Sequence, residues 1–155
     1  MIHVDFKQIS SRYKRELLEN CLPFWLENSQ DKEFGGYYSC LNRDGSVYDT
    51  DKFIWLQGRE VWMFAMLYNN VEKNQEWLDC AIQGAEFLKK YGHDENWDFY
   101  FSLNREGRPL VQPYNIFSNT FACMAFAQLA KATGNEEYAQ IARKIFTRIL
   151  ERRSN

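Results

Sequence analysis

Two segments of this chain, Phe53–Tyr68 and Ile116–Ala132, are apolar around almost their whole circumference if they form helices. A helix that is hydrophobic on every side is normally buried by its neighbours rather than resting on a surface. Each is followed by an amphipathic segment, Gln75–Tyr91 and Glu136–Arg152, with apolar residues at spacings of three and four. The sequence therefore predicts an all-α fold in which buried inner helices alternate with outer helices that cover them.

A repeated turn sequence divides the chain into two similar units. Leu41–Gly45 reads LNRDG, and Leu103–Gly107 reads LNREG. An Asn, an acidic residue and a Gly in this order suit the tight turn of a β-hairpin. A short hairpin is thus expected before each inner helix, which makes the repeating unit a helical hairpin with a β insertion.

The segment before the first hairpin, Asp5–Asn28, has apolar residues on one side only and predicts an outer helix, which brings the total to about five helices. Pro23 is expected to kink its last turn. Asp49 and Asp51 precede the first inner helix, and this spacing allows a hard-cation site or a helix cap. Capping by Asp51 or Thr50 is favoured, because a calcium loop needs further oxygen ligands and a Gly.

Length and composition bound the possible functions. A chain of 155 residues is the size of a single domain, 1–155, and its net charge of −2 gives no electrostatic footprint for nucleic acid or an acidic membrane. No segment is apolar enough to span a bilayer, no secretory leader opens the chain, and the four cysteines lack any Cys-x-x-Cys spacing. We therefore expect a cytoplasmic protein with reduced thiols and neither a metal nor another cofactor. Aromatic residues, at 17% of the chain, suit a carbohydrate site or a very aromatic core.

Trp55 and Arg59 are the unusual pair on the first inner helix. They are four residues apart, so both lie on one face of the helix, and the guanidinium is always charged. Burying such a charge is unfavourable unless it is paired or lines a cavity where a polar ligand meets it. Two interpretations stay open: a structural Arg paired with a carboxylate of a neighbouring helix, or a binding site.

Glycine and aromatic motifs recur along the chain in a particular order and spacing. They are Phe24-Trp25, Gly35-Gly36-Tyr37-Tyr38, Asp44-Gly45, Lys52, Trp55-Leu56-Gln57-Gly58-Arg59, Trp62, Ile116-Phe117-Ser118 and Ala132-Thr133-Gly134. In this order they resemble the amino-terminal part of the N-acylglucosamine 2-epimerase family, which includes the cellobiose 2-epimerases. The resemblance implies an (α/α)6 barrel, a toroid of six inner and six outer helices, in proteins well over twice this length. This chain is then expected to be a partial (α/α)6 toroid, the amino-terminal portion of the barrel.

The resemblance implies a sugar 2-epimerase, an isomerase that inverts C2 of an aldose such as N-acetylglucosamine or N-acetylmannosamine through an enediolate. Moving a proton between the two faces of C2 is done best by two acid/base groups with a cation near the oxyanion. By the same resemblance, Arg59 is this cation, Trp55 lies beside the sugar, and a pair of histidines in later helices supplies the bases.

Three further polar residues are predicted to contact the sugar. Ser118 and Asn119 begin the second inner helix at the height at which Leu56 and Gln57 begin the first. On this correspondence, Gln57, Ser118 and Asn119 line the mouth of the substrate site together with Arg59.

The expected pair of bases has no match in this sequence. The two histidines are His3, near the amino terminus, and His93, in the loop after the third helix. Both are expected to be solvated surface residues, and neither matches a family base. The chain is therefore expected to be an amino-terminal fragment that carries the substrate-orienting residues but is inactive alone.

Two alternatives belong to other functional classes. The first is a non-catalytic carbohydrate-binding or dimerising helical module, because an open edge of a toroid would expose apolar side chains and favour self-association or a homo-oligomer. The second is a glycoside hydrolase, which needs two carboxylates on either side of a bond. The inner helices offer only Glu60, which argues against the hydrolase.

Overall fold

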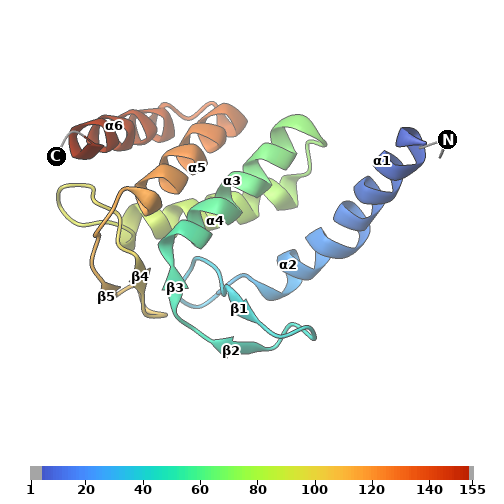
Figure 1. Cartoon of the computed structure of the whole chain (residues 1–155), viewed down its shortest axis with the longest axis horizontal. Coiled ribbons are helices and arrows are strands. Elements are labelled where there is room, and N and C mark those ends of the chain that lie inside the picture. The colour runs from blue at the N-terminus through green and yellow to red at the C-terminus, as the bar shows by residue number, and fades with distance from the viewer. Residues whose placement is uncertain (1–4, 154–155) are drawn as a thin grey trace.

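The computed structural model describes residues 5–153, and helices dominate it (Figure 1). The helical elements are α1 (Phe6–Arg15), the π-helical turn η1 (Glu16–Cys21), α2 (Leu22–Asn28), α3 (Ile54–Asn70), α4 (Gln75–Tyr91), α5 (Phe117–Thr133) and α6 (Glu136–Arg153). The short strands are β1 (Cys40–Leu41), β2 (Val47–Asp49), β3 (Lys52–Phe53), β4 (Ser102–Leu103) and β5 (Pro109–Val111). The predicted all-α fold with about five helices and short hairpins is confirmed. None of these helices is long and apolar enough to cross a membrane.

The inner helices α3 and α5 pack side by side, while α4 covers α3 and α6 covers α5. Their close approach depends on Gly58. A Cβ atom added at this position would lie 2.9 Å from the backbone carbon of Phe121 on α5. Real Cβ atoms essentially never approach other atoms so closely, so glycine lets the two inner helices meet backbone to backbone.

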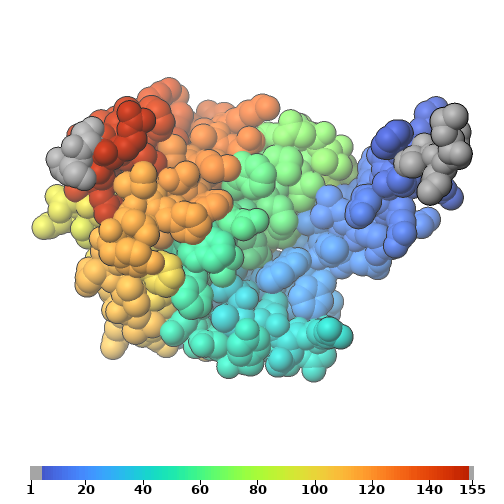
Figure 2. Space-filling model, viewed as in Figure 1, coloured from blue at the N-terminus to red at the C-terminus, as the bar shows by residue number. Residues whose placement is uncertain are grey.

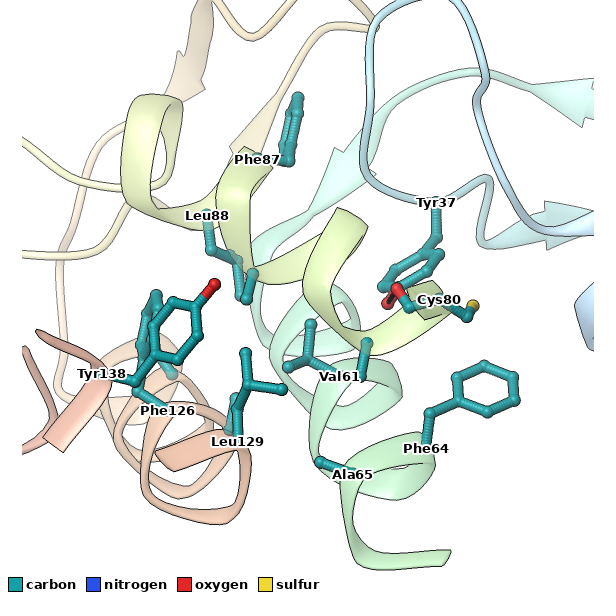
Figure 3. Close-up of a cluster of buried hydrophobic side chains, with 14 of the residues drawn as sticks. Tyr37, Val61, Phe64, Ala65, Cys80, Phe87, Leu88, Phe126, Leu129 and Tyr138 are labelled. Atoms are coloured by element: carbon teal, nitrogen blue, oxygen red, sulfur yellow. Dashed lines mark hydrogen bonds between the residues drawn. The ribbon is translucent and has the colours of Figure 1, made fainter. Parts of the chain in front are cut away.

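The hydrophobic core lies between the inner and outer helices (Figure 3). Phe64 of α3 and Phe126 of α5 are fully buried in it. Tyr37 reaches in from the segment before β1, and its hydroxyl donates a hydrogen bond to the carbonyl of Cys80 on α4 at 2.7 Å. Part of the high aromatic content of the chain therefore lies in the core. The buried tyrosine has a hydrogen-bond partner, as buried polar groups require.

The first outer helix is continuous but changes its winding. Pro23, which was expected to kink the last turn, is the second residue of α2, and the π-helical turn Glu16–Cys21 ends two residues before it. Proline has no N–H and its ring crowds the carbonyl four residues earlier, which a widened turn accommodates. The part before this turn, α1, has no buried residue and extends away from the rest of the molecule (Figures 1 and 2).

The two predicted hairpins are present and alike. In the first, Asn42 N donates to Ser46 O at 2.9 Å, and in the second, Asn104 N donates to Arg108 O at 2.8 Å. Each turn is completed by a glycine in the left-handed region, with φ of +85° and +92°. β1 pairs with β2, whereas β3 pairs with β4 and joins the second hairpin in a three-stranded antiparallel sheet, β3-β4-β5. The sheet therefore ties the two units together.

The predicted cap of the first inner helix is wrong. The helix begins at Ile54 with Phe53 as its N-cap residue, and no side chain of Thr50 or Asp51 bonds to its first turn. Because β3 runs directly into the helix, Ile54 N donates instead to the carbonyl of Phe101 in the neighbouring unit, at 3.0 Å. The Asp49 carboxylate accepts from Asp51 N at 2.8 Å, which forms a local turn.

Candidate functional site

Arg59 stands on the exposed face of α3 among aromatic rings. Its guanidinium carbon lies 5.9 Å from the ring centroid of Trp55 and 5.6 Å from that of Phe121 on α5. Both distances are within the range of a cation–π interaction. Within residues 5–153, Arg59 has no carboxylate in ion-pair contact. The guanidinium is therefore solvent-accessible and held by rings, not paired with a neighbouring helix.

A pocket of about 500 Å³ opens beside this guanidinium. Ligand pockets for small molecules generally have about 300–1,000 Å³. Residues from α2, from the segment before β1 and from α3 line it: Trp25, Ser39, Leu56, Arg59, Glu60, Trp62 and Met63. Trp55 lies outside this lining and packs against Phe117 and Phe121, with ring centroids 5.6 Å and 6.1 Å away. The tryptophans that face the pocket are thus Trp25 and Trp62.

Glu60 supplies the carboxyl group of this pocket. Ser29 Oγ lies 2.5 Å from Glu60 Oε1, and Ser29 itself is fully buried. Burial raises the pKa of Glu60 to about 8. The partner of Glu60 is therefore Ser29, the residue that directly follows α2.

Gln57 and Asn119 are both buried and hold backbone segments in place. The Gln57 amide accepts from Tyr37 N and donates to Tyr37 O, both at 2.8 Å. The Asn119 amide accepts from Phe99 N at 3.1 Å and donates to Trp97 O at 2.9 Å. These contacts give each amide a structural role at the start of an inner helix.

The side-chain amides of Gln57 and Asn119, which we call amide clamps, occupy equivalent positions in the two units. The separation in sequence between Gln57 and Asn119 equals the separation between their partners, Tyr37 and Phe99. The predicted correspondence in height between the two inner helices is therefore confirmed by equivalent hydrogen bonds. Ser118 is likewise buried, in the first turn of α5. The part of Gln57, Ser118 and Asn119 in sugar binding stays a prediction.

A buried ion cluster near the two hairpins escaped the sequence analysis. Lys52 Nζ donates to Asp31 Oδ2 at 3.0 Å, and neither side chain has any exposed surface. Arg105 Nε donates to the same carboxylate oxygen at 3.0 Å. Lys52 also donates to the carbonyls of Gly35 and Arg105, at 2.6 Å and 2.8 Å. The cluster joins the first unit to the second hairpin.

The hydrogen bonds in this cluster determine its charge states. Burial raises the pKa of the Asp31 carboxyl, but hydrogen bonds from Arg105 and Lys52 outweigh it and hold that pKa well below its usual range. Burial lowers the pKa of Lys52, and the Asp31 carboxylate opposes this shift. We conclude that Asp31 is ionised and Lys52 protonated near neutral pH, because the three acceptors around Lys52 Nζ match the three donors of an ammonium group.

His93 is half-buried rather than solvated, which corrects the expectation for this residue. Its ring stacks on Trp97 at 3.9 Å and lies between the carbonyls of Asp94 and Lys89, at 2.6 Å and 3.2 Å. It follows α4, an outer helix, and does not line the pocket beside Arg59. His3 lies outside the described residues. Across residues 5–153, no group of three or more His, Cys, Asp and Glu side chains is arranged to hold a metal ion.

Comparison with known proteins points to one family. The family model for N-acylglucosamine 2-epimerase (GlcNAc 2-epimerase) matches residues 36–155. The chain is 40% identical over 147 residues to the N-acylglucosamine 2-epimerase of Mus musculus, an alignment that covers 92% of this chain and 35% of that protein. It is 29% identical over 151 residues to the cellobiose 2-epimerase of Dictyoglomus turgidum, covering 96% of this chain and 38% of that protein.

A solved structure shows the same arrangement of helices. The cellobiose 2-epimerase of Spirochaeta thermophila DSM 6192 superimposes with a TM-score of 0.84 at 27% identity, over 94% of this chain and 36% of that one. The likeness confirms the predicted helical toroid, of which this chain forms a part. The chain spans about a third of the length of the relatives that it matches.

Proposed function

This chain belongs to the N-acylglucosamine 2-epimerase family, and we propose that it forms the substrate-orienting part of a sugar 2-epimerase but lacks the bases that move the C2 proton. The observation that carries the proposal is Arg59, whose guanidinium forms no ion pair among residues 5–153 and lies over two aromatic rings and beside a pocket. A guanidinium offers a planar fork of donors to a sugar oxygen or to an enediolate oxyanion. Trp25 and Trp62 give the sugar ring apolar faces to stack on.

The substrate that fits best is N-acetylglucosamine or N-acetylmannosamine. The chain is 40% identical to an N-acylglucosamine 2-epimerase and 29% identical to a cellobiose 2-epimerase. Leu56 and Met63 add apolar lining to the pocket that an acetyl methyl group would contact. The sugar opens, loses its C2 proton to a base, and regains a proton on the opposite face, with Arg59 stabilising the charge that develops on oxygen.

The test joins this chain to the rest of a relative's sequence. Residues 1–155 replace the matching first third of the Mus musculus relative, and epimerisation of N-acetylmannosamine is followed. We expect the chimera to be active, because the inner helices of this chain would then meet the remainder of the toroid. A chimera that folds and binds the sugar but does not turn it over would contradict the proposal.

The alternative function, a binding or dimerising module, is favoured by the exposed apolar side chains. On the α5–α6 side, Met124 and Phe146 are 38% and 54% exposed, and on α1, Phe6 and Tyr13 are 78% and 72% exposed. Apolar surface gathered in this way promotes association.

We therefore expect the chain to self-associate through the side of α5 that a closed ring would cover. Association should be detectable at tens of micromolar, an order of magnitude suited to weak apolar contacts. Sedimentation velocity measures this, and Met124→Asp with Phe146→Asp should shift the chain towards monomer. Tyr48→Asp, at an exposed aromatic residue of β2, is the control away from α5. A compact monomer at this concentration would refute the prediction.

A further inference from the structure

Glu60 and Ser29 form a hydrogen-bonded pair at the wall of the pocket. Ser29 Oγ lies 2.5 Å from Glu60 Oε1 and 2.6 Å from the carbonyl oxygen of Trp25. Both distances are short even for O–H···O bonds, so a proton is needed in each gap. The serine hydroxyl has one proton and can donate to only one of the two neighbours.

The number of available protons determines the protonation state of the Glu60 carboxyl group. If Ser29 donates to the Trp25 carbonyl, Glu60 must donate to Ser29, and only the un-ionised carboxylic acid has a proton to give. The Trp25 carbonyl also accepts from Ser29 N at 2.9 Å, but an ionised Glu60 would still place two acceptor oxygens within 2.6 Å of the buried Ser29 hydroxyl, which has one proton. The geometry thus favours a neutral Glu60, independently of its raised pKa.

The charged and titratable groups around Glu60 agree with this state. Arg59, on the same helix, lies over the rings of Trp55 and Phe121 and forms no ion pair with Glu60. From α4 comes Cys80 and from the segment before β1 comes Tyr37, and burial raises the pKa of both groups. Both groups are neutral when protonated and negative when ionised, so neither supplies a positive charge that would favour a carboxylate.

Ser39 gives a second sign that the pocket takes a polar ligand. Its hydroxyl oxygen is buried, lines the pocket region with Glu60, and has no hydrogen-bond partner among residues 5–153. Such a group normally finds a partner, because leaving it unpaired is unfavourable by about 1–3 kcal/mol. A neutral sugar, rich in hydroxyl groups, provides donors and acceptors for Glu60, and for Ser39 once its buried hydroxyl rotates towards the pocket.

We propose that Glu60 contacts the sugar in this pocket as a neutral carboxylic acid, which donates its proton to Ser29 and accepts a hydrogen bond from a sugar hydroxyl at its other oxygen. This inference rests on the proposed function, since it takes the pocket to be the sugar site. Ionising Glu60 disrupts the Ser29 contact that fixes the carboxyl group. Sugar affinity therefore depends on one proton.

The experiment measures sugar binding against pH. Trp25 and Trp62 line the pocket, so the intrinsic fluorescence of the chain reports the binding of N-acetylmannosamine. We expect constant affinity from pH 6 to 7 and a loss of about tenfold by pH 9, since one required proton is released with a pKa of about 8. Glu60→Gln should keep affinity within about threefold and remove the pH dependence, because the amide keeps a donor and an acceptor but does not ionise.

Two controls make the outcome decisive. Glu60→Leu should weaken binding at every pH, and Glu27→Gln, on the exposed surface of α2, should leave the pH profile unchanged. In the sugar-free chain, carboxyl ¹³C NMR should show Glu60 titrating far above its ordinary range. Titration near pH 4.5 would overturn the neutral acid. Wild-type affinity that is independent of pH would overturn the Glu60 contact and leave the sugar site intact, whereas no binding by any variant would overturn both.

Discussion

Asp31→Asn is expected to lower the free energy of unfolding by about 3–5 kcal/mol, the range for removing one partner of a buried ion pair. The Lys52 ammonium, which has no exposed surface and lies 3.0 Å from Asp31 Oδ2, would remain buried without its counter-ion. Its other contacts, the carbonyls of Gly35 and Arg105, are neutral acceptors and do not replace a carboxylate. Urea unfolding followed by tryptophan fluorescence measures the loss.

Glu136→Gln is the matched control. Glu136 pairs with Arg143 at 2.7 Å, but the side chains of Arg143 and Glu136 are 68% and 64% exposed. Exposed pairs contribute about 0–1 kcal/mol, so this change should be nearly neutral. A loss below about 1 kcal/mol for Asp31→Asn would show that the remaining contacts hold Lys52 without the carboxylate.

Because of the same cluster, part of the free energy of unfolding is lost in acid. The pKa of Asp31 is lower in the folded chain than its ordinary value of 3.8, so the unfolded chain binds more protons as the pH falls. The stabilisation is fully present above about pH 4 and is lost as the pH falls through the folded pKa. In Asp31→Asn, the decrease in the free energy of unfolding that comes from protonating Asp31 should disappear.

Arg59→Lys is expected to lower the turnover of the chimera on N-acetylmannosamine by about 10²-fold, the effect of losing one oxyanion donor. The ammonium keeps the charge but not the planar fork that meets a developing oxyanion with two parallel donors. The interaction strengthens in the transition state, so the loss should appear in kcat more than in KM.

Arg43→Lys is the control for this substitution, because Arg43 is an exposed residue of the first hairpin turn. It should leave both kcat and KM unchanged. If Arg59→Lys kept the turnover of the unsubstituted chimera, Arg59 would have only a structural role among the rings of Trp55 and Phe121.

The helices and hairpins could be predicted from sequence because their signals are local. Apolar periodicity placed α4 at its observed bounds and α3 and α5 within two residues of theirs. The LNRDG and LNREG turns located both hairpins. The cap of α3 was predicted wrongly because its first N–H is satisfied by Phe101, a residue distant in sequence, and local patterns carry no information about such contacts.

The candidate site was predictable only in part. The sequence drew attention to Arg59 but left open whether it pairs with a carboxylate or lines a site. In the same way, a polar residue in an apolar helix suggests either a ligand contact or a buried amide clamp. Gln57 and Asn119 are such clamps, and the signal that pointed to them was the repeat itself, which relates them by the same offset as the two hairpin turns. The buried pair Asp31 and Lys52 had no local signal, because its residues meet only in the folded chain.

The central claim is that this chain orients a sugar but does not move its C2 proton. A base contributes about 10²- to 10⁴-fold to proton transfer, so positioning by Arg59 alone should leave no detectable exchange. His93, the one histidine among the described residues, follows an outer helix and lies outside the pocket lining.

The most direct test is the incorporation of deuterium from heavy water at C2 of N-acetylmannosamine, because it detects proton removal even when net conversion is too small to see. We expect no exchange above a protein-free control for residues 1–155 alone, and clear exchange for the chimera, which carries the other two thirds of the Mus musculus relative. Exchange by the chain alone would contradict the account: if His93→Ala abolished it, His93 would be the base, and if it persisted, another group such as Glu60 would be.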